Sequence, residues 1–230
     1  MNVKEVLQGV EKFCIHYKSD DKCNNSRYHS WEHCYENFYM ARKWAKADVE
    51  YLSLHLAFYL ASWGMYRGSS FLIEKDYKVH IPVVREILKA EYDILCNVTC
   101  DELLDKTTRD QLDKLTDFIR KYYYNVREDV KGAGVKEPVS ATLITKILMG
   151  TLGCVPAYDK YFVKGLKSIG NIKGTYNMNS VKELAQFYKD NLELLEEKRK
   201  ELKVGDIIYP QMKLLDMGFW QIGKSVEEKQ

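Results

Sequence analysis

The chain has 230 residues, of which 46% are hydrophobic and 13% aromatic, so it can bury a core without disulfide or metal staples. Its 35 lysines and arginines nearly balance 33 aspartates and glutamates, which excludes a strongly basic molecule, so any nucleic-acid site must be local. Six cysteines at irregular spacings, without a CxxC pair, favour reduced thiols in a cytoplasmic protein over a disulfide framework.

Apolar residues recur at steps of three and four through most of the chain, and strand-like alternation is scarce. The pattern predicts an all-α fold, with one all-helical domain over 1–230 and lobes at 1–130 and 138–230. The segment 127–138 joins the lobes, and a second break falls at 170–179. The expected helices are 3–17, 31–47, 49–66, 82–90, 101–124, 141–149, 157–168, 180–202 and 209–220.

Two helix starts carry the pattern of a capping box, in which a hydroxyl and a glutamate three residues later satisfy each other's backbone amides. They are Thr99 with Glu102 and Ser180 with Glu183. At the N-terminus of the chain, the residues lack the apolar core of a signal peptide. The most apolar stretch, 52–65, is shorter than the roughly 20 residues of a membrane-spanning helix, so we expect neither export nor a span.

The segment 49–66 has no conventional polar face, which predicts a central helix packed on all sides. Its apolar face consists of Leu54, Phe58, Ala61 and Met65. A second stripe combines aromatic rings with hydrogen-bonding groups, the mixture that a ligand pocket needs. Its members are His55, Tyr59, Trp63, Tyr66 and, just beyond the helix, Arg67. The alternative is that this stripe is ordinary core, with its polar atoms hydrogen-bonded to the backbone.

The loop after this helix contains Gly64, Gly68 and two serines, so it is either an anion-binding nest reinforced by Arg67 or a plain loop. Around His33 and Cys34 the spacings of a closed zinc site are missing, and we expect neither a metal nor a cofactor. Walker, GxSxG and dinucleotide motifs are also missing, which disfavours phosphate-loop enzymes, serine hydrolases and Rossmann oxidoreductases.

One segment, 143–170, carries a recognisable pattern. An apolar helix ends in Leu152-Gly153, a short turn contains Pro156, Asp159 opens the next helix, and Ile169-Gly170 closes it. This pattern resembles the helix-hairpin-helix DNA glycosylases, a two-lobed helical family in which that aspartate is catalytic. The resemblance implies that Asp159 is catalytic, that the partner is DNA, and that the reaction hydrolyses the N-glycosidic bond of a damaged or modified base.

The sequence departs from the family's pattern just before this helix. Where the family has a glycine-rich hairpin, this chain reads Glu137-Pro138-Val139, and the position of the lysine of bifunctional members falls near Ser140 and Ala141. Lys146 is close by but does not align. The resemblance therefore implies a monofunctional enzyme that uses water, with no Schiff-base intermediate.

Elementary chemistry gives Asp159 a role without the family. Cleavage of a base from deoxyribose builds positive charge on the sugar, and a carboxylate both stabilises that charge and activates the attacking water. Backbone amides at a helix start favour the charged form of such a carboxylate. The alternative role of Asp159 is that of an N-cap, worth about 1 kcal/mol.

Other residues near Asp159 suit a DNA substrate. Lys160, Lys164 and Lys167 place positive charge on the helix that Asp159 opens, as phosphate contacts require, although a solvated helix face explains them as well. An enzyme that acts on a base must extrude it into an aromatic pocket, which Tyr158 and the stripe 55–66 are expected to line. The abundance of aromatic residues suggests a bulky or modified base, as in glycosylases that serve in phage defence.

Two other classes of function remain open. The first is a non-catalytic helical module that binds nucleic acid or a partner protein, in which the stripe is core. The second is a nuclease or nucleotide hydrolase, which requires convergent carboxylates and a divalent metal. Asp159 has no acidic companion close to it in sequence, and Glu74, Asp76, Asp101 and Glu102 lie elsewhere.

Overall fold

The structure is a computed structural model that describes residues 2–18, 26–44, 47–132, 138–169 and 172–229. It is 73% helical, which confirms the all-α class. The α-helices are α1 (Val3–Lys18), α2 (His29–Lys43), α3 (Val49–Ser62), α4 (Ile81–Ile87), α5 (Cys100–Leu103), α6 (Lys106–Lys131), α7 (Ala141–Thr151), α8 (Lys160–Ile169), α9 (Met178–Asp190), α10 (Leu192–Arg199) and α11 (Gln211–Glu227). Short 3-10 helices are η1 (Phe71–Glu74), η2 (Tyr77–His80) and η3 (Ala90–Leu95).

A small hairpin was not expected from the sequence. Strand β1 (Lys203–Val204) pairs antiparallel with β2 (Ile207–Ile208), with Lys203 opposite Ile208. One of the six cysteines, Cys23, lies outside the described residues, and so do Glu137 and Gly170.

Side-chain caps explain where several helices differ from expectation. The expected helix 101–124 is two helices, because the Asp105 carboxylate accepts a hydrogen bond from the Thr108 amide and starts α6 there. The expected helix 180–202 likewise breaks at Asn191. The Thr99–Glu102 capping box is confirmed. The expected box starting at Ser180 is wrong, because Asn177 caps α9 and Ser180 is the third helical residue of that box.

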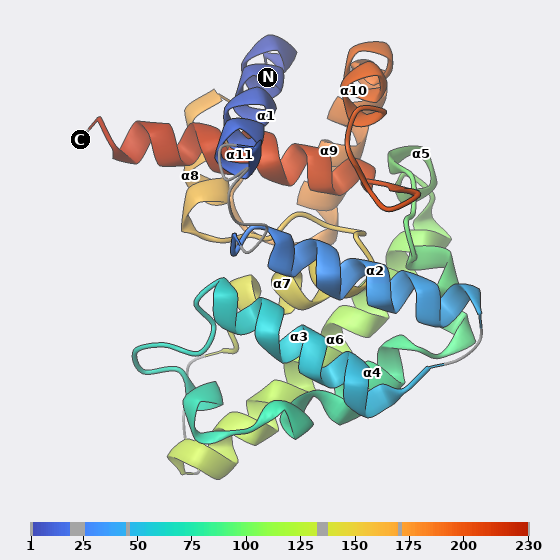
Figure 1. Cartoon of the computed structure of the whole chain (residues 1–230), viewed down its shortest axis with the longest axis vertical. Helices are drawn as coiled ribbons and strands as arrows, with labels where there is room; N and C mark the ends of the chain where they lie inside the picture. Colours follow the sequence, from blue (N-terminus) through green and yellow to red (C-terminus); the bar gives the residue numbers. More distant parts are fainter. Residues whose placement is uncertain (1, 19–25, 45–46, 133–137, 170–171, 230) are drawn as a thin grey trace.

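Two groups of helices lie at opposite ends of the molecule (Figure 1). In the view of Figure 1, α1, α8 and α11 gather at the top, α3, α4 and α6 lie at the bottom, and α2 and α7 pass between them. Helix α11 packs against both α1 and α8, while α7 packs against α2, α3 and α6. Buried residues from α1 through α11 form one hydrophobic cluster, so both groups of helices share a single core with α7.

Close helix crossings hold α11 in place. A Cβ atom on Gly9 of α1 would lie 2.5 Å from the carbonyl oxygen of Gly218 in α11. On the other side, a Cβ atom on Gly165 of α8 would lie 1.9 Å from the carbonyl oxygen of Phe219. Only glycine allows the backbones to approach this closely. The crossing therefore fixes the position of α8 relative to α11, and with it the residues that these two helices contribute to the site.

The expectation that α3 is packed on all sides is wrong. Leu52, Leu56 and Leu60 are buried against neighbouring helices, but Leu54 and Phe58 on the opposite face are 51% and 57% exposed. The sequence pattern is apolar on both faces and does not indicate which face packs against other helices. In the structure, α2, α4 and α7 cover one face of α3. In the described part of the chain, no helix has both the length and the apolar character needed to cross a bilayer.

Candidate functional site

The connection between α7 and α8 positions Asp159. Thr145 of α7 accepts a hydrogen bond from the backbone amide of Tyr158 at 2.9 Å, and Thr142 donates to the Tyr158 carbonyl at 2.9 Å. From α11, a carboxylate oxygen of Asp216 accepts a hydrogen bond from the Ala157 amide at 3.0 Å. Two separate helices therefore fix the backbone on which Asp159 sits.

The two carboxylate oxygens of Asp159 have different surroundings. Oδ1 accepts hydrogen bonds from the amides of Tyr161 at 3.0 Å and Phe162 at 3.1 Å, so it caps the N-terminus of α8. Oδ2 lies 3.7 Å from the Nζ atom of Lys146, and the side chain is 13% exposed. The capping role and a chemical role therefore do not compete, because one oxygen caps the helix and the other faces a charged group.

Lys146 is the closest cationic partner of Asp159. It projects from α7, its side chain is only 4% exposed, and its ammonium group donates to the carbonyl oxygen of Trp63 at 2.8 Å. The same ammonium lies 5.6 Å from the centre of the Trp63 ring, within the range of a cation–π contact. Lys146 is thus held beside Asp159 by three groups that favour its charged form.

A second buried ion pair lines the same small cavity as the first. Lys213 and Asp216, one turn apart on α11, form a contact of 2.9 Å with side chains only 6% and 9% exposed. The ammonium of Lys213 also lies over the rings of Trp31 and Phe13. A small cavity of about 10 Å³, walled by Tyr59, Trp63 and Trp220 among others, is lined by both ion pairs. Two carboxylates and two ammonium groups thus share one buried volume.

Burial shifts the titration of the Asp159–Lys146 pair. It raises the pKa of Asp159 above its ordinary value, against the Lys146 charge and the amides of Phe162 and Tyr161, which lower that pKa. Burial also lowers the pKa of Lys146, against the opposing charges of Asp159 and Asp216. Both pKa values move toward neutrality, which suits a carboxylate that must accept a proton during a reaction.

The Asp159 carboxylate opens into a cleft of about 700 Å³, a volume typical of ligand sites. Four cationic side chains line it against the single carboxylate, together with three aromatic rings and several small residues. The cations are Arg27, Arg67, Lys146 and Lys160, and the rings are Trp63, Tyr161 and Trp220. The cleft is therefore basic and aromatic, and Asp159 is its only acidic group among the described residues.

Part of the sequence-predicted site comes together here. Trp63, Arg67 and Lys160 line the cleft with Asp159, and Tyr59 lines the small cavity beneath it. Tyr59 is 3% exposed and packs so closely on α7 that a Cβ atom on Gly150 would meet its ring at 2.5 Å. The segment after His55 thus supplies one wall of the site.

The remaining predicted pocket residues do not line the Asp159 cleft. His55 is half-buried, contacts the ring of Tyr51, and lines neither the cleft nor the small cavity. Tyr66 is hydrogen-bonded at 2.7 Å to the buried His80, whose other ring nitrogen bonds to Tyr123. Tyr158 is buried with its hydroxyl 2.8 Å from Ser180. These three residues therefore line neither the cleft nor the small cavity.

The three lysines of α8 also have distinct positions. Lys160 and Lys164 both pair with Glu227 of α11, and only Lys160 lines the cleft. Lys167 is exposed on the surface. In the loop after α3, Gly64 and Gly68 have φ angles of +79° and +60°, and the turn they form brings Arg67 to the cleft.

Sequence reasoning missed several residues of this site. Asp216 and Lys213 come from a helix more than fifty residues away from Asp159 along the chain, and Arg27 and Trp220 come from opposite ends of the sequence. One signal was present: Lys213 and Asp216 are the charged residues within an otherwise apolar turn of α11. Charged residues buried in an apolar helix mark either an ion pair or a functional site.

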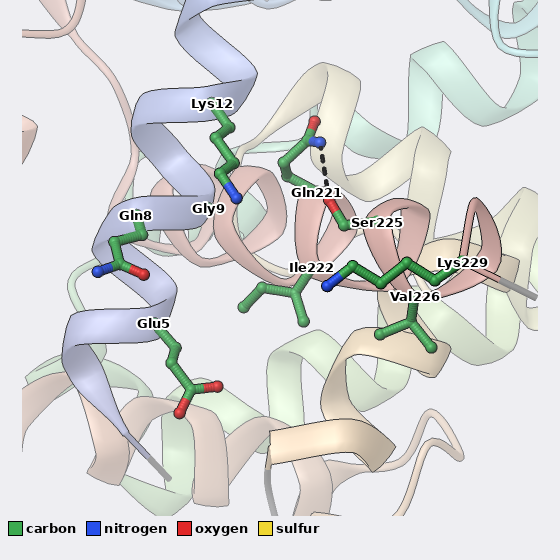
Figure 2. A pocket seen from close by; sticks show the side chains of 9 residues that line it. All are labelled: Glu5, Gln8, Gly9, Lys12, Gln221, Ile222, Ser225, Val226 and Lys229. Carbon is green, nitrogen blue, oxygen red and sulfur yellow. Dashed lines mark hydrogen bonds between the residues drawn. The ribbon is translucent and has the colours of Figure 1, made fainter.

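A second cavity, of about 210 Å³, lies between α1 and α11 (Figure 2). Gln8 and Lys12 of α1 line it together with Gln221 and Ser225 of α11, and a hydrogen bond of 3.3 Å joins the last two. This cavity shares no lining residue with the Asp159 cleft. Glu5, Lys12 and Lys229 line it, but among the described residues no aromatic ring does, in contrast to that cleft.

Comparison with family models, curated proteins and solved structures finds no match for this chain. Within the described part of the chain, no three histidine, cysteine, aspartate or glutamate side chains converge as metal ligands. Asp159 and Asp216, the two carboxylates of the small cavity, are each paired with a lysine. Their surroundings therefore do not resemble the paired carboxylates of a metal-dependent nuclease.

Proposed function

We propose that this protein is a monofunctional DNA glycosylase that hydrolyses the bond between a damaged or modified base and its deoxyribose. The observation that carries the proposal is the position of Asp159 in a basic, aromatic cleft: one carboxylate oxygen caps α8, and the other lies beside Lys146. The cations of this cleft suit contacts with the phosphates of a DNA backbone. Its aromatic rings suit stacking on a base that has been extruded from the duplex.

The order of elements around Asp159 supports a relationship to the helix-hairpin-helix glycosylases. Helix α6 leads through a connection to α7, and Asp159 stands at the start of α8 after a turn containing Pro156. This is the order that the resemblance implies, and we propose the same fold family. We also propose a reducing, cytoplasmic location, because Cys34, Cys100 and Cys154 are buried free thiols.

In the proposed reaction, the bond between C1′ of the sugar and the base nitrogen breaks and the electron pair leaves with the base. The Asp159 carboxylate stabilises the positive charge that develops on the sugar. A water molecule adds its oxygen to C1′ and gives a proton to Asp159, and that proton passes on to the departing base. The products are a free base and an abasic site.

Lys146 acts in this reaction as a charged neighbour of Asp159. Its ammonium already has the Trp63 carbonyl, the Trp63 ring and the Asp159 carboxylate as partners, so it holds the carboxylate ionised. An imine with the sugar requires a free, neutral amine that leaves these partners. We therefore propose that water is the nucleophile and Lys146 is not.

The test compares the wild type with Asp159→Asn on duplexes that carry single damaged or modified bases, and on glucosylated phage DNA. Asparagine keeps an oxygen for the cap of α8 but removes the charge, so the variant is a matched control for folding. Abasic sites, scored by cleavage in hot alkali, are expected from the wild type alone. Borohydride reduction during the reaction is expected to trap no protein–DNA adduct; a trapped adduct lost in Lys146→Gln would contradict the water mechanism.

A further inference from the structure

Cationic side chains of the protein itself lie over the aromatic rings that line the Asp159 cleft. Arg27 lies 5.4 Å from the centre of the Trp63 ring, and Lys146 lies 5.6 Å from it. Lys160 lies 5.7 Å from the Tyr161 ring, and Lys224 lies 5.6 Å from the Trp220 ring. All three rings that line the cleft therefore carry a positive charge within cation–π range.

This arrangement matters because aromatic cages bind cationic ligands through their ring faces. A ligand with a positive charge gains nothing from a ring that a lysine or arginine already covers, and it meets four cations of the cleft at close range. Two of these cations are offset, because Lys146 pairs with Asp159 at 3.7 Å and Lys160 pairs with Glu227. Arg27 and Arg67 remain, and neither pairs with a carboxylate of the described residues.

The hydrogen-bonding groups of the cleft point to the same kind of ligand. Guanidinium groups only donate hydrogen bonds, so Arg27 and Arg67 require acceptors on the ligand, whereas Lys160 already donates to Glu227. Ser140 accepts a hydrogen bond from the Leu143 amide at 3.3 Å, which leaves its hydroxyl proton free to donate as well. A base edge rich in carbonyl oxygens satisfies this surface, and a base that only donates does not.

We propose that the cleft selects bases that are neutral or anionic and rich in carbonyl acceptors, as oxidised bases are, and excludes bases that carry a positive charge, as alkylated purines do. This inference rests on the proposed function, since it names the substrate class of the same site. Its physical origin is the positive charge of Arg27 and Arg67, which acts on any ligand in the cleft whether or not a bond is cleaved.

The test is a binding measurement that needs no catalysis. Two deoxynucleosides serve as probes: 8-oxo-deoxyguanosine, which is neutral with two carbonyl groups, and 1-methyl-deoxyadenosine, which is cationic at neutral pH. Binding is followed by quenching of tryptophan fluorescence, because Trp63 and Trp220 line the cleft. The wild type is expected to bind the neutral probe at least about tenfold more tightly than the cationic one.

A double variant, Arg27→Gln with Arg67→Gln, removes two cations of the cleft from exposed positions, so its fold is expected to persist and is checked by thermal unfolding. Its preference for the neutral probe is expected to fall to roughly threefold or less. The matched control is Lys106→Gln, a lysine on α6 whose side chain is 83% exposed and does not line the cleft, and it is expected to keep the full preference.

The outcomes separate this inference from the reaction. Equal binding of the two probes, tighter binding of the cationic probe, or no quenching by either at millimolar concentration overturns the selectivity. Selective binding by a protein that forms no abasic sites on any DNA keeps the selectivity and refutes the glycosylase. Excision of an alkylated, cationic base as fast as an oxidised one keeps the glycosylase and refutes the selectivity.

Discussion

The crossing of α8 and α11 provides a stringent test of how the fold positions the site. Gly165 lies where α8 touches α11, and a Cβ atom there would stand 1.9 Å from the carbonyl oxygen of Phe219, although ordinary contact begins at 3.4 Å. The obstacle is backbone, which cannot swing aside as a side chain does. Gly165→Ala therefore has to push the two helices apart.

Two effects of opposite sign decide the stability of Gly165→Ala. Helix propensity alone favours alanine over glycine by about 1 kcal/mol. Overpacking of a filled core costs about 1–3 kcal/mol, and a backbone obstacle puts this site at the upper end. We expect a net loss of about 2 kcal/mol, which lowers the melting temperature by roughly 4–8 °C for a chain of this length.

The same displacement reaches the site, because α8 begins after Asp159 and α11 carries Asp216 and Trp220. A shift of about 1 Å in reacting groups costs on the order of a hundredfold in rate. Urea unfolding and the abasic-site assay, both below the melting temperature, measure the two effects. Lys167→Ala on the exposed face of α8 is the control and should stay within about 0.5 kcal/mol of the wild type. A Gly165→Ala protein that is more stable than the wild type and fully active would refute this reasoning.

Three further predictions concern single side chains. Lys146→Met removes the charge that lowers the pKa of Asp159. The acid limb of the pH–rate profile should therefore move to higher pH by about one to three units. A limb that does not move would show that Lys146 does not act on the catalytic carboxylate. Asp216→Asn removes a charge that raises the pKa of Asp159, so the limb should move toward lower pH, and an upward shift in the same profile would contradict the assignment. Tyr66→Phe should lower the free energy of unfolding by about 1–3 kcal/mol, because it strips the buried His80 of a partner, while the abasic-site assay shows unchanged activity.

Local features of the site were predictable from sequence. The residues from Leu152-Gly153 to Asp159 predict a helix end, a turn and a new helix start, and that is what α7 and α8 form around them. Gly153 has a φ angle of +69° and closes α7, and Asp159 caps α8. Such features follow from the chain's own backbone hydrogen bonds, so a short stretch of sequence contains the information.

Features that depend on partners far along the chain were not predictable. The spacing that groups Tyr66 with Trp63 on one stripe fails because α3 ends at Ser62, after which the chain turns and Tyr66 meets His80. The burial of Asp216 beside Asp159 results from the α8–α11 crossing, which no local pattern specifies. The exposed apolar face at Leu54 and Phe58 likewise depends on which neighbours pack against α3.

The central claim is that the charge of Asp159 drives base release, and the most direct measurement is the single-turnover rate of abasic-site formation by the wild type and Asp159→Asn on an oxidised-base duplex. The account predicts a loss of at least about a hundredfold in the variant, with DNA binding and melting temperature retained. Equal rates in the two proteins, or a wild type that releases no base from any duplex while binding DNA as tightly as the variant, would contradict it.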